Sequence, residues 1–252
     1  FRVASQRGAP RPVHRIATVD AHKSERVDKR EHASHGHPQT GAAQVVYGVG
    51  DPTGAPALFN TFYIVNPTTG VATLPAVPST LPAGVSESVA IGVSPINGLV
   101  YWVERGVVTP RFGTWNPSTG ATSIVGNAAT PAGVGSFLRS TFCPDGRFYI
   151  AANGAAGGAG AEIYEINPST GALNRTIIVS NLPLNGSGDI VCKTNGDLYI
   201  VVQSTAPTPT TGPYRLYRAT QAQLSAGGTF AASLQGNVGT STQAINGLSE
   251  RA

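Results

Sequence analysis

A five-residue phrase that returns at a nearly constant interval constrains the fold of this chain most strongly. Its three copies are Asn66-Pro67-Thr68-Thr69-Gly70, Asn116-Pro117-Ser118-Thr119-Gly120 and Asn167-Pro168-Ser169-Thr170-Gly171. The prolines, at positions 67, 117 and 168, are 50 and then 51 residues apart. An interval of about 50 residues fits one four-stranded blade of a propeller better than it fits a helical repeat. The repeat therefore predicts a protein built from similar β-sheet units.

Each copy of the phrase has the composition of a tight hairpin turn. The first copy lies between the apolar runs Phe62-Tyr63-Ile64-Val65 and Val71-Ala72-Thr73-Leu74. Asn can accept hydrogen bonds from the backbone just after it, Pro presets φ for the turn, and Gly adopts the left-handed conformation that closes it. We therefore interpret the phrase as a connection between strands and not as a functional signature.

A second turn signal runs in step with the first. It consists of Asn97-Gly98, Asp145-Gly146 and Asn195-Gly196, which are 48 and 50 residues apart. Such dipeptides are the strongest short-range hairpin signal. One unit then comprises an inner strand, this turn, a second strand, a loop, a third strand, the Asn-Pro phrase and an outer strand. The predicted fold class is all-β, a β-propeller of four-stranded antiparallel blades, with units at about 87–126, 135–179 and 188–234. In the last unit the phrase has decayed to Thr220-Gln221, and we give no weight to a helical turn at 220–225.

The first unit lacks an obvious inner strand, because the residues before its second strand at 42–49 are charged and rich in His. Four blades are favoured if Thr242-Gln243-Ala244-Ile245-Asn246-Gly247-Leu248 supplies that strand and closes the ring. Closure would remove the open sheet edges. The alternative is that Ile245-Asn246-Gly247-Leu248, identical to Ile96-Asn97-Gly98-Leu99, opens a fifth unit of a larger propeller that is incomplete in this chain.

Charge separates two parts of the chain. Residues 1–40 hold eight Lys and Arg, four Asp and Glu, and all five His, whereas residues 41–252 hold nine of each charge sign. We predict a disordered segment over 1–40 and a single neutral propeller domain over 41–252. The basic pI thus describes the first segment, which lacks the interleaved aromatic residues that stack on bases, and we expect no nucleic-acid partner. No apolar run approaches the roughly 20 residues of a membrane span.

Several features indicate a secreted, extracellular protein. The chain has no Met and starts at Phe1, which predicts the loss of a leader such as a signal peptide. Lys29 and Arg30 resemble the dibasic site that processing proteases cut in fungal secreted precursors, so residues 1–30 would be a pro-segment. Asn174 and Asn185 lie in N-x-S/T sequons and would carry glycans in a secretory compartment. The alternative for both sequons is that their Asn, Ser and Thr residues only form turns.

The two cysteines, Cys143 and Cys192, fall near the ends of neighbouring inner strands. Cys143 lies two residues before its Asp145-Gly146 turn, and Cys192 lies three before Asn195-Gly196. Residues that are out of phase on adjacent strands point to opposite faces, so a disulfide would need a local bulge. A disulfide and two buried free thiols both remain open, and we favour the free thiols.

The mouth of the central channel is the expected ligand site of a propeller. Arg139 and Asp189 each lie six residues before their turn, at equivalent heights on adjacent inner strands. They are candidates for a charged channel site. The favoured interpretation is a partly buried ion pair that fixes the register of the blades, because an unpaired buried charge is costly.

A second candidate is the cluster His32, His35 and His37, whose closely spaced imidazoles could coordinate Cu²⁺, Ni²⁺ or Zn²⁺. A flexible segment does not preorganise such a site, and a solvated linker is the favoured interpretation.

Over residues 42–252, the recurring Asn-Pro and Thr-Gly turns resemble those of gluconolactonase-like and strictosidine-synthase-like propellers. Members with lactonase activity hold a divalent cation at the channel mouth, and this resemblance would assign Glu87, Asn153 and Asp189 as oxygen ligands of calcium. However, residues 41–252 contain no His to act as a general base, and no set of four ligands falls at equivalent heights.

Two functions remain open on the sequence. The favoured function is a secreted, non-enzymatic binding module that needs no cofactor and has a protein or carbohydrate partner. The alternative is a calcium-dependent, lactonase-like hydrolase with its site at the channel mouth.

Overall fold

The computed structural model of the chain describes residues 15–19, 45–50, 59–66, 68–105, 107, 109–128, 137–152, 161–182, 188–203 and 213–240. These residues form strands and turns, with one short helix.

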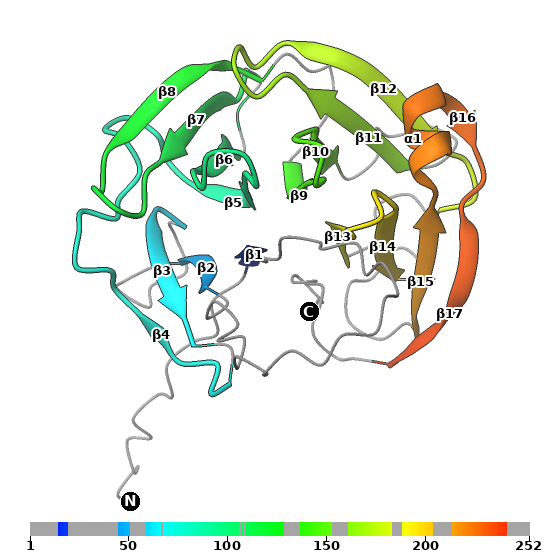
Figure 1. Cartoon of the computed structure of the whole chain (residues 1–252), viewed down its shortest axis with the longest axis horizontal. Coiled ribbons are helices and arrows are strands. Elements are labelled where there is room, and N and C mark those ends of the chain that lie inside the picture. Colours follow the sequence, from blue (N-terminus) through cyan, green and yellow to red (C-terminus); the bar gives the residue numbers. More distant parts are fainter. Residues whose placement is uncertain are drawn as a thin grey trace, which may run out of the picture.

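Four antiparallel sheets stand side by side around a common centre, as blades (Figure 1). Blade 1 contains β1 (Arg15–Val19), β2 (Val45–Gly50), β3 (Thr61–Val65) and β4 (Ala72–Thr73). Blade 2 contains β5 (Ser88–Val93), β6 (Val100–Glu104), β7 (Arg111–Trp115) and β8 (Thr122–Asn127). Blade 3 contains β9 (Phe137–Phe142), β10 (Phe148–Ala152), β11 (Ala161–Ile166) and β12 (Leu173–Val179). Blade 4 contains β13 (Gly188–Cys192), β14 (Leu198–Gln203), β15 (Pro213–Ala219) and β17 (Ser233–Thr240). The predicted all-β, four-bladed propeller is confirmed.

The inner strand of blade 1 comes from a part of the chain where none was expected. β1 pairs antiparallel with β2, from Arg15 opposite Val49 to Val19 opposite Val45. This differs from the expectation that residues 1–40 lack structure and that residues 242–248 supply the strand. The average composition of residues 1–40 concealed Arg15-Ile16-Ala17-Thr18-Val19, a short β-favouring run that needs only the open backbone edge of β2. The rest of 1–40, and all of 241–252, lie outside the described residues, so the domain boundary at residue 40 stays a prediction.

The Asn-Pro phrase forms the same turn in all three blades that carry it. The Oδ1 atoms of Asn66, Asn116 and Asn167 each accept a hydrogen bond of 2.9 Å from the backbone two residues later. The amide of the closing glycine donates to the carbonyl oxygen of the same Asn at 2.8 Å in each copy. Gly70, Gly120 and Gly171 have φ values of 70, 74 and 76°. The roles predicted for Asn, as hydrogen-bond acceptor, and for Gly, as the residue with a positive φ, are therefore present in all three copies.

The phrase also packs against the preceding blade. A Cβ atom on Gly171 would lie 2.5 Å from the backbone oxygen of Asn127, at the end of the outer strand of blade 2. One on Gly120 would lie 2.5 Å from Cδ of Pro78, which follows the outer strand of blade 1. Both glycines are buried. Only glycine combines a positive φ with so close an approach, so the turn joins neighbouring blades as well as strands.

The hydrophobic core lies between the blades. Within the described residues, three clusters of buried side chains fill the junctions of blades 1 and 2, 2 and 3, and 3 and 4. Aromatic rings dominate the first two: Phe62 stacks on Trp115 with ring centroids 4.7 Å apart, and Phe142 stacks on Phe148 at 4.6 Å. Each blade is therefore stabilised mainly by its neighbour.

A helix, α1 (Gln221–Ala226), follows the third strand of blade 4, where the phrase has decayed. Thr220 caps it: the hydroxyl of Thr220 accepts from the amide of Gln223 at 3.2 Å, and the Gln223 side chain accepts from the amide of Thr220 at 2.9 Å. β16 (Gly228–Phe230) then pairs parallel with β12 of blade 3. This helix was not predicted from the sequence, although Thr220-Gln221-Ala222-Gln223 has the capping-box pattern.

Candidate functional site

The inner strands define two faces of the ring. β5, β9 and β13 end at the Asn-Gly and Asp-Gly turns, and we call that side the turn face. They begin at the opposite side, which we call the entrance face. Because the second strands run antiparallel to the inner strands, β6, β10 and β14 end at the entrance face.

Arg139 and Asp189 lie at the entrance face on the adjacent inner strands β9 and β13. Each is 4% exposed, and Nε of Arg139 donates to the backbone oxygen of Gly188 at 2.9 Å. Burial lowers the pKa of Arg139, while the neighbouring Asp189 and Tyr214 act to raise it. Oδ1 of Asp189 accepts from the amide of Ile190 at 2.8 Å. The structure thus brings these two predicted residues into electrostatic contact across two blades.

Gln203 joins this group from the end of β14. It is 2% exposed, and its Nε2 atom has no hydrogen-bond partner among the described residues. It lies opposite Tyr214 in the pairing of β14 with β15, and Tyr214 interacts in turn with Arg139. We call Arg139, Asp189, Gln203 and Tyr214 the entrance cluster. Sequence reasoning missed Gln203, and the signal was an amide ending the otherwise apolar strand Leu198–Gln203.

A second buried polar group at the entrance face belongs to blade 2 and is fully paired. The carboxylate of Glu104, 2% exposed, accepts from Nε of Arg111 at 2.7 Å and from its Nη2 at 2.6 Å. It also accepts from the backbone amides of Ser86 and Arg111. The hydrogen bond from the Arg111 side chain is the main cause that holds the pKa of Glu104 below its ordinary value, although burial opposes it. This group is interpreted as structural.

Glu87 and Asp189, two of the three candidate calcium ligands, interact with different partners. Glu87 forms an ion pair with Arg105 at 3.6 Å, and Asp189 belongs to the entrance cluster. Asn153 lies outside the described residues, as do His32, His35 and His37. In the part of the chain that the structure describes, no three His, Cys, Asp or Glu side chains are grouped to hold a metal ion.

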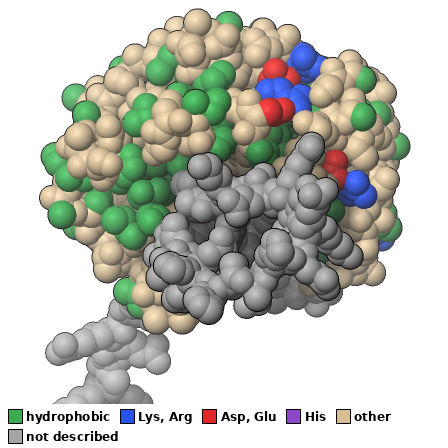
Figure 2. Space-filling model, in the orientation of Figure 1, with side chains coloured by type: hydrophobic (Ala, Val, Ile, Leu, Met, Phe, Trp, Pro, Cys, Tyr) green, Lys and Arg blue, Asp and Glu red, His purple; other side chains and the backbone are tan. Residues whose placement is uncertain are grey.

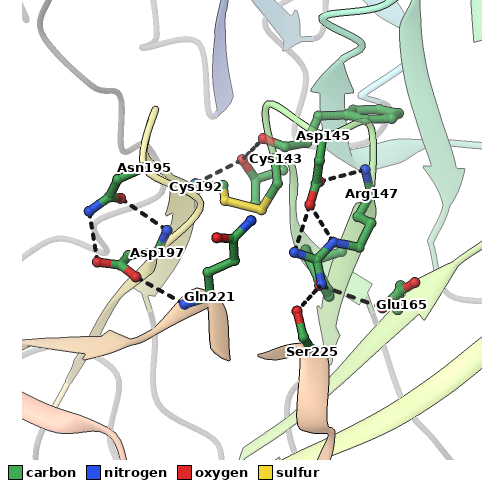
Figure 3. The surroundings of a disulfide bond; sticks show 12 residues. Cys143, Asp145, Arg147, Glu165, Cys192, Asn195, Asp197, Gln221 and Ser225 are labelled. Carbon is green, nitrogen blue, oxygen red and sulfur yellow. Dashed lines mark hydrogen bonds and ion pairs between the residues drawn. A yellow bond between two sulfur atoms is a disulfide. The ribbon is translucent and has the colours of Figure 1, made fainter. Parts of the chain in front are cut away.

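Cys143 and Cys192 form a disulfide at the turn face between blades 3 and 4 (Figure 3). Their Cα atoms are 5.0 Å apart. The favoured interpretation as two free thiols was wrong, because Cys143 lies one residue beyond the end of β9. Strand alternation no longer fixes the direction of its side chain there, and no bulge in the strand is needed.

Ion pairs hold helix α1 beside this disulfide (Figure 3). Arg147 pairs with Asp145 at 2.7 Å and donates from Nη1 to Oγ of Ser225 at 3.1 Å. Asp197 pairs with Arg218 at 2.7 Å and accepts from the amide of Gln221 at 2.9 Å. In the view of Figure 2, the charged side chains gather in two groups over blades 3 and 4. The sequence predicted none of these contacts.

The predicted modification sites are mostly outside the described residues. Asn174 is exposed on β12, and its Nδ2 donates to Oε1 of Glu165 at 3.3 Å. Asn185, Lys29 and Arg30 fall in undescribed segments, so glycosylation there and cleavage remain predictions. No helix in the described part of the chain has the length and apolar character needed to cross a membrane.

Comparison with known proteins identifies the architecture. No protein-family model matches the sequence, and no curated protein matches it. A Bacteroides thetaiotaomicron protein of unknown function has a similar solved structure, with a TM-score of 0.51 and 15% identity over 80% of this chain and 49% of its own. The fold is that of a β-propeller. The identity is low, so the likeness shows the fold alone.

Two further solved structures are similar at lower scores. One belongs to a nidogen/laminin complex, with a TM-score of 0.45 and 10% identity over 81% of this chain and 62% of that chain. The other is an auxiliary nutrient binding protein from Bacteroides ovatus, with a TM-score of 0.47 and 13% identity over 75% of this chain and 38% of that chain. This chain thus spans less than two thirds of each. The finer resemblance to gluconolactonase-like propellers stays a prediction.

Proposed function

We propose that this chain is a binding propeller that receives a neutral polar group of its ligand at the entrance cluster. One observation carries the proposal: the buried Nε2 atom of Gln203 has no acceptor among the described residues. A buried donor without a partner costs about 1–3 kcal/mol. Native proteins keep few such groups, and each one calls for an explanation, of which a functional role is one.

The charge of the cluster indicates which group would bind. Arg139 and Asp189 carry opposite charges and interact with each other, so they leave little net charge for a ligand to neutralise. A neutral amide donor suits a carbonyl or hydroxyl oxygen better than a carboxylate or phosphate. Sugar hydroxyls and peptide carbonyls both have this chemistry.

A secreted location belongs to the same proposal. Disulfides persist in oxidising compartments and are rare in the cytosol, and the Cys143–Cys192 bond joins two blades. The bond supports the indication given by the dibasic pair and the sequons in the sequence. A binding module outside the cell would meet carbohydrate or protein surfaces directly.

The proposal is tested by screening the whole chain on oligosaccharide and peptide arrays and measuring Kd for the best binder by calorimetry. Gln203→Leu preserves the approximate volume and removes the amide. We expect it to weaken binding at least about tenfold, the effect of about 1.4 kcal/mol. The matched control is Gln235→Leu, on exposed β17, which should change Kd less than about twofold.

Thermal unfolding of the same variants completes the test. If the Gln203 amide lacks a partner in the free protein, Gln203→Leu should leave the stability unchanged or raise it. No ligand on either array, or a ligand that Gln203→Leu binds as tightly as the original chain, would overturn the proposal. A loss of more than about 2 kcal/mol of stability would do so too, because the amide would then already be paired.

A further inference from the structure

The junction between blade 4 and blade 1 differs from the other three in how the Asn-Pro turn is covered. Gly120 and Gly171 are buried against the preceding blade, whereas Gly70 is exposed. Among the described residues, nothing lies within 4 Å of a Cβ atom built on Gly70. The turn, with the same hydrogen bond from the Gly amide to the Asn carbonyl, is therefore docked in blades 2 and 3 and open in blade 1.

At each of the other three junctions, the covering residues come from one place in the repeat. They are the last residue of an outer strand or lie within a few residues after its end. Pro78 follows β4 and covers Gly120, while Asn127 ends β8 and covers Gly171. Asn181 follows β12 and bonds through its side chain to both backbone groups of Ala232, at 2.8 and 2.9 Å. By this rule, the residues that should cover blade 1 are those that follow β17.

The uncovered surface of blade 1 contains an apolar groove of about 480 Å³. Its lining consists of uncharged side chains: Val45, Ile64, Val65, Asn66, Thr69, Val71 and Thr73. Val71 is 57% exposed and Val45 is 37% exposed, so the groove offers apolar surface to an occupant.

We propose that residues 241–248 dock in this groove and cover the turn at 66–70. In Figure 1, β17 of the last blade and β4 of the first blade are neighbours around the ring, so the chain leaves β17 on the side of blade 1. Residues 241–248 carry no charge and include Ile245 and Leu248, which matches the apolar lining. Eight extended residues reach about 26–29 Å.

This docking differs from the role that the sequence suggested for the same segment. β1 already pairs with β2 and occupies the inner position of blade 1. Residues 241–248 would instead lie toward the rim, at the place where Pro78 and Asn127 lie in the other junctions. The proposal does not depend on the function of the entrance cluster.

Amide hydrogen exchange tests it in the full chain. The amide of Gly70 donates to the carbonyl of Asn66 at 2.8 Å, as the amides of Gly120 and Gly171 do in their own turns. These two amides serve as internal references. We expect Gly70 to exchange within about tenfold of the references, and Ile245→Asp to raise its rate by at least about tenfold while the references stay unchanged. Ile245→Ser is a milder variant in case Asp perturbs folding.

The matched control is Ile96→Asp, in the identical tetrapeptide, where the side chain is 74% exposed. It should leave the exchange of Gly70 unchanged. Fast exchange of Gly70 in the unmodified chain would overturn the proposal, and so would slow exchange that Ile245→Asp does not alter. Protection that depends on protein concentration, with a doubled mass in light scattering, would assign the groove to a second copy of the chain and also overturn it.

Discussion

The indole Nε1 of Trp115 donates a hydrogen bond to the backbone oxygen of Pro78, 2.9 Å away. Trp115 lies on the third strand of blade 2, and Pro78 follows the outer strand of blade 1. Beside this bond, Pro78 also covers the turn glycine Gly120. Pro78 therefore contacts blade 2 at two places, the buried side chain of Trp115 and the backbone of the turn at Gly120.

Trp115→Phe should remove this bond while keeping an aromatic ring against Phe62. We expect a larger loss of stability than from Trp102→Phe, by about 1 kcal/mol, because the carbonyl of Pro78 is left without its donor. Trp102 is an apt control, since it is equally buried and its Nε1 has no hydrogen-bond partner among the described residues. Urea unfolding of both variants measures the difference, and equal losses would contradict the assigned bond.

The disulfide closes a loop between residues 49 positions apart. Replacing Cys143 and Cys192 together by Ser should lower the free energy of unfolding by about 2–4 kcal/mol, chiefly through the greater freedom of the unfolded chain. The same loss should appear when the original chain is unfolded with a reductant present. The double variant itself should not respond to reductant, and a response would mean that the effect lies elsewhere.

Stability should fall at acid pH in part through Glu104. Hydrogen bonds from Arg111 hold the pKa of this carboxyl below its ordinary value of 4.5, with burial opposing them. A carboxyl with a lowered pKa in the folded state stabilises the protein above the unfolded pKa, and this is lost as the pH falls through the folded pKa. The free energy of unfolding should therefore be flat near neutral pH and decline below about pH 4.

Glu104→Gln should make this decline shallower and lower the stability at pH 7 by about 1–3 kcal/mol, because Arg111, which is partly exposed, loses its charged partner. Chemical unfolding at several pH values measures both effects. An unchanged acid slope in Glu104→Gln would show that other carboxyls govern the decline.

Thr220→Ala should weaken helix α1 at its first turn. The hydroxyl of Thr220 caps the amide of Gln223, and such caps contribute about 0.5–2 kcal/mol. Thr229→Ala, on exposed β16, should cost less than about 0.5 kcal/mol. Amide exchange within α1 should rise only in the first variant. If both variants behave alike, the cap contributes nothing to the fold.

The sequence predicted the repeating parts of the fold because the turns that define them depend on local chemistry. Asn accepts from the next backbone amides and Gly supplies a positive φ whatever surrounds them, so period, strand order and fold class were accessible. The pairing of β1 with β2 could not be predicted from the sequence, because β1 is hydrogen-bonded through its backbone to a strand that begins at Val45. Only the position of β2 in space shows that an edge is open for it.

The polar site was partly accessible for the same reason. Arg139 and Asp189 were found by counting back from the turns, which works because adjacent inner strands share one register. Gln203 lies on a second strand, and the lack of a partner for its Nε2 atom among the described residues is visible only when the surrounding side chains are in place. The disulfide was misjudged because alternation was extended beyond the end of β9 to Cys143.

The central claim is that the Asn-Pro turns of blades 2 and 3 hold these blades against the preceding ones, and one pair of variants tests it most directly. Gly98→Ala introduces a side chain at a positive φ of 69° with nothing within 4 Å among the described residues, and should cost about 1–2 kcal/mol. Gly171→Ala has the same conformational cost, with φ at 76°, and a Cβ atom 2.5 Å from the backbone oxygen of Asn127. Measured by urea unfolding, Gly171→Ala should lose at least about 1 kcal/mol more, because the two blades must move apart. Equal losses in the two variants would contradict the claim that this turn packs blade 3 against blade 2.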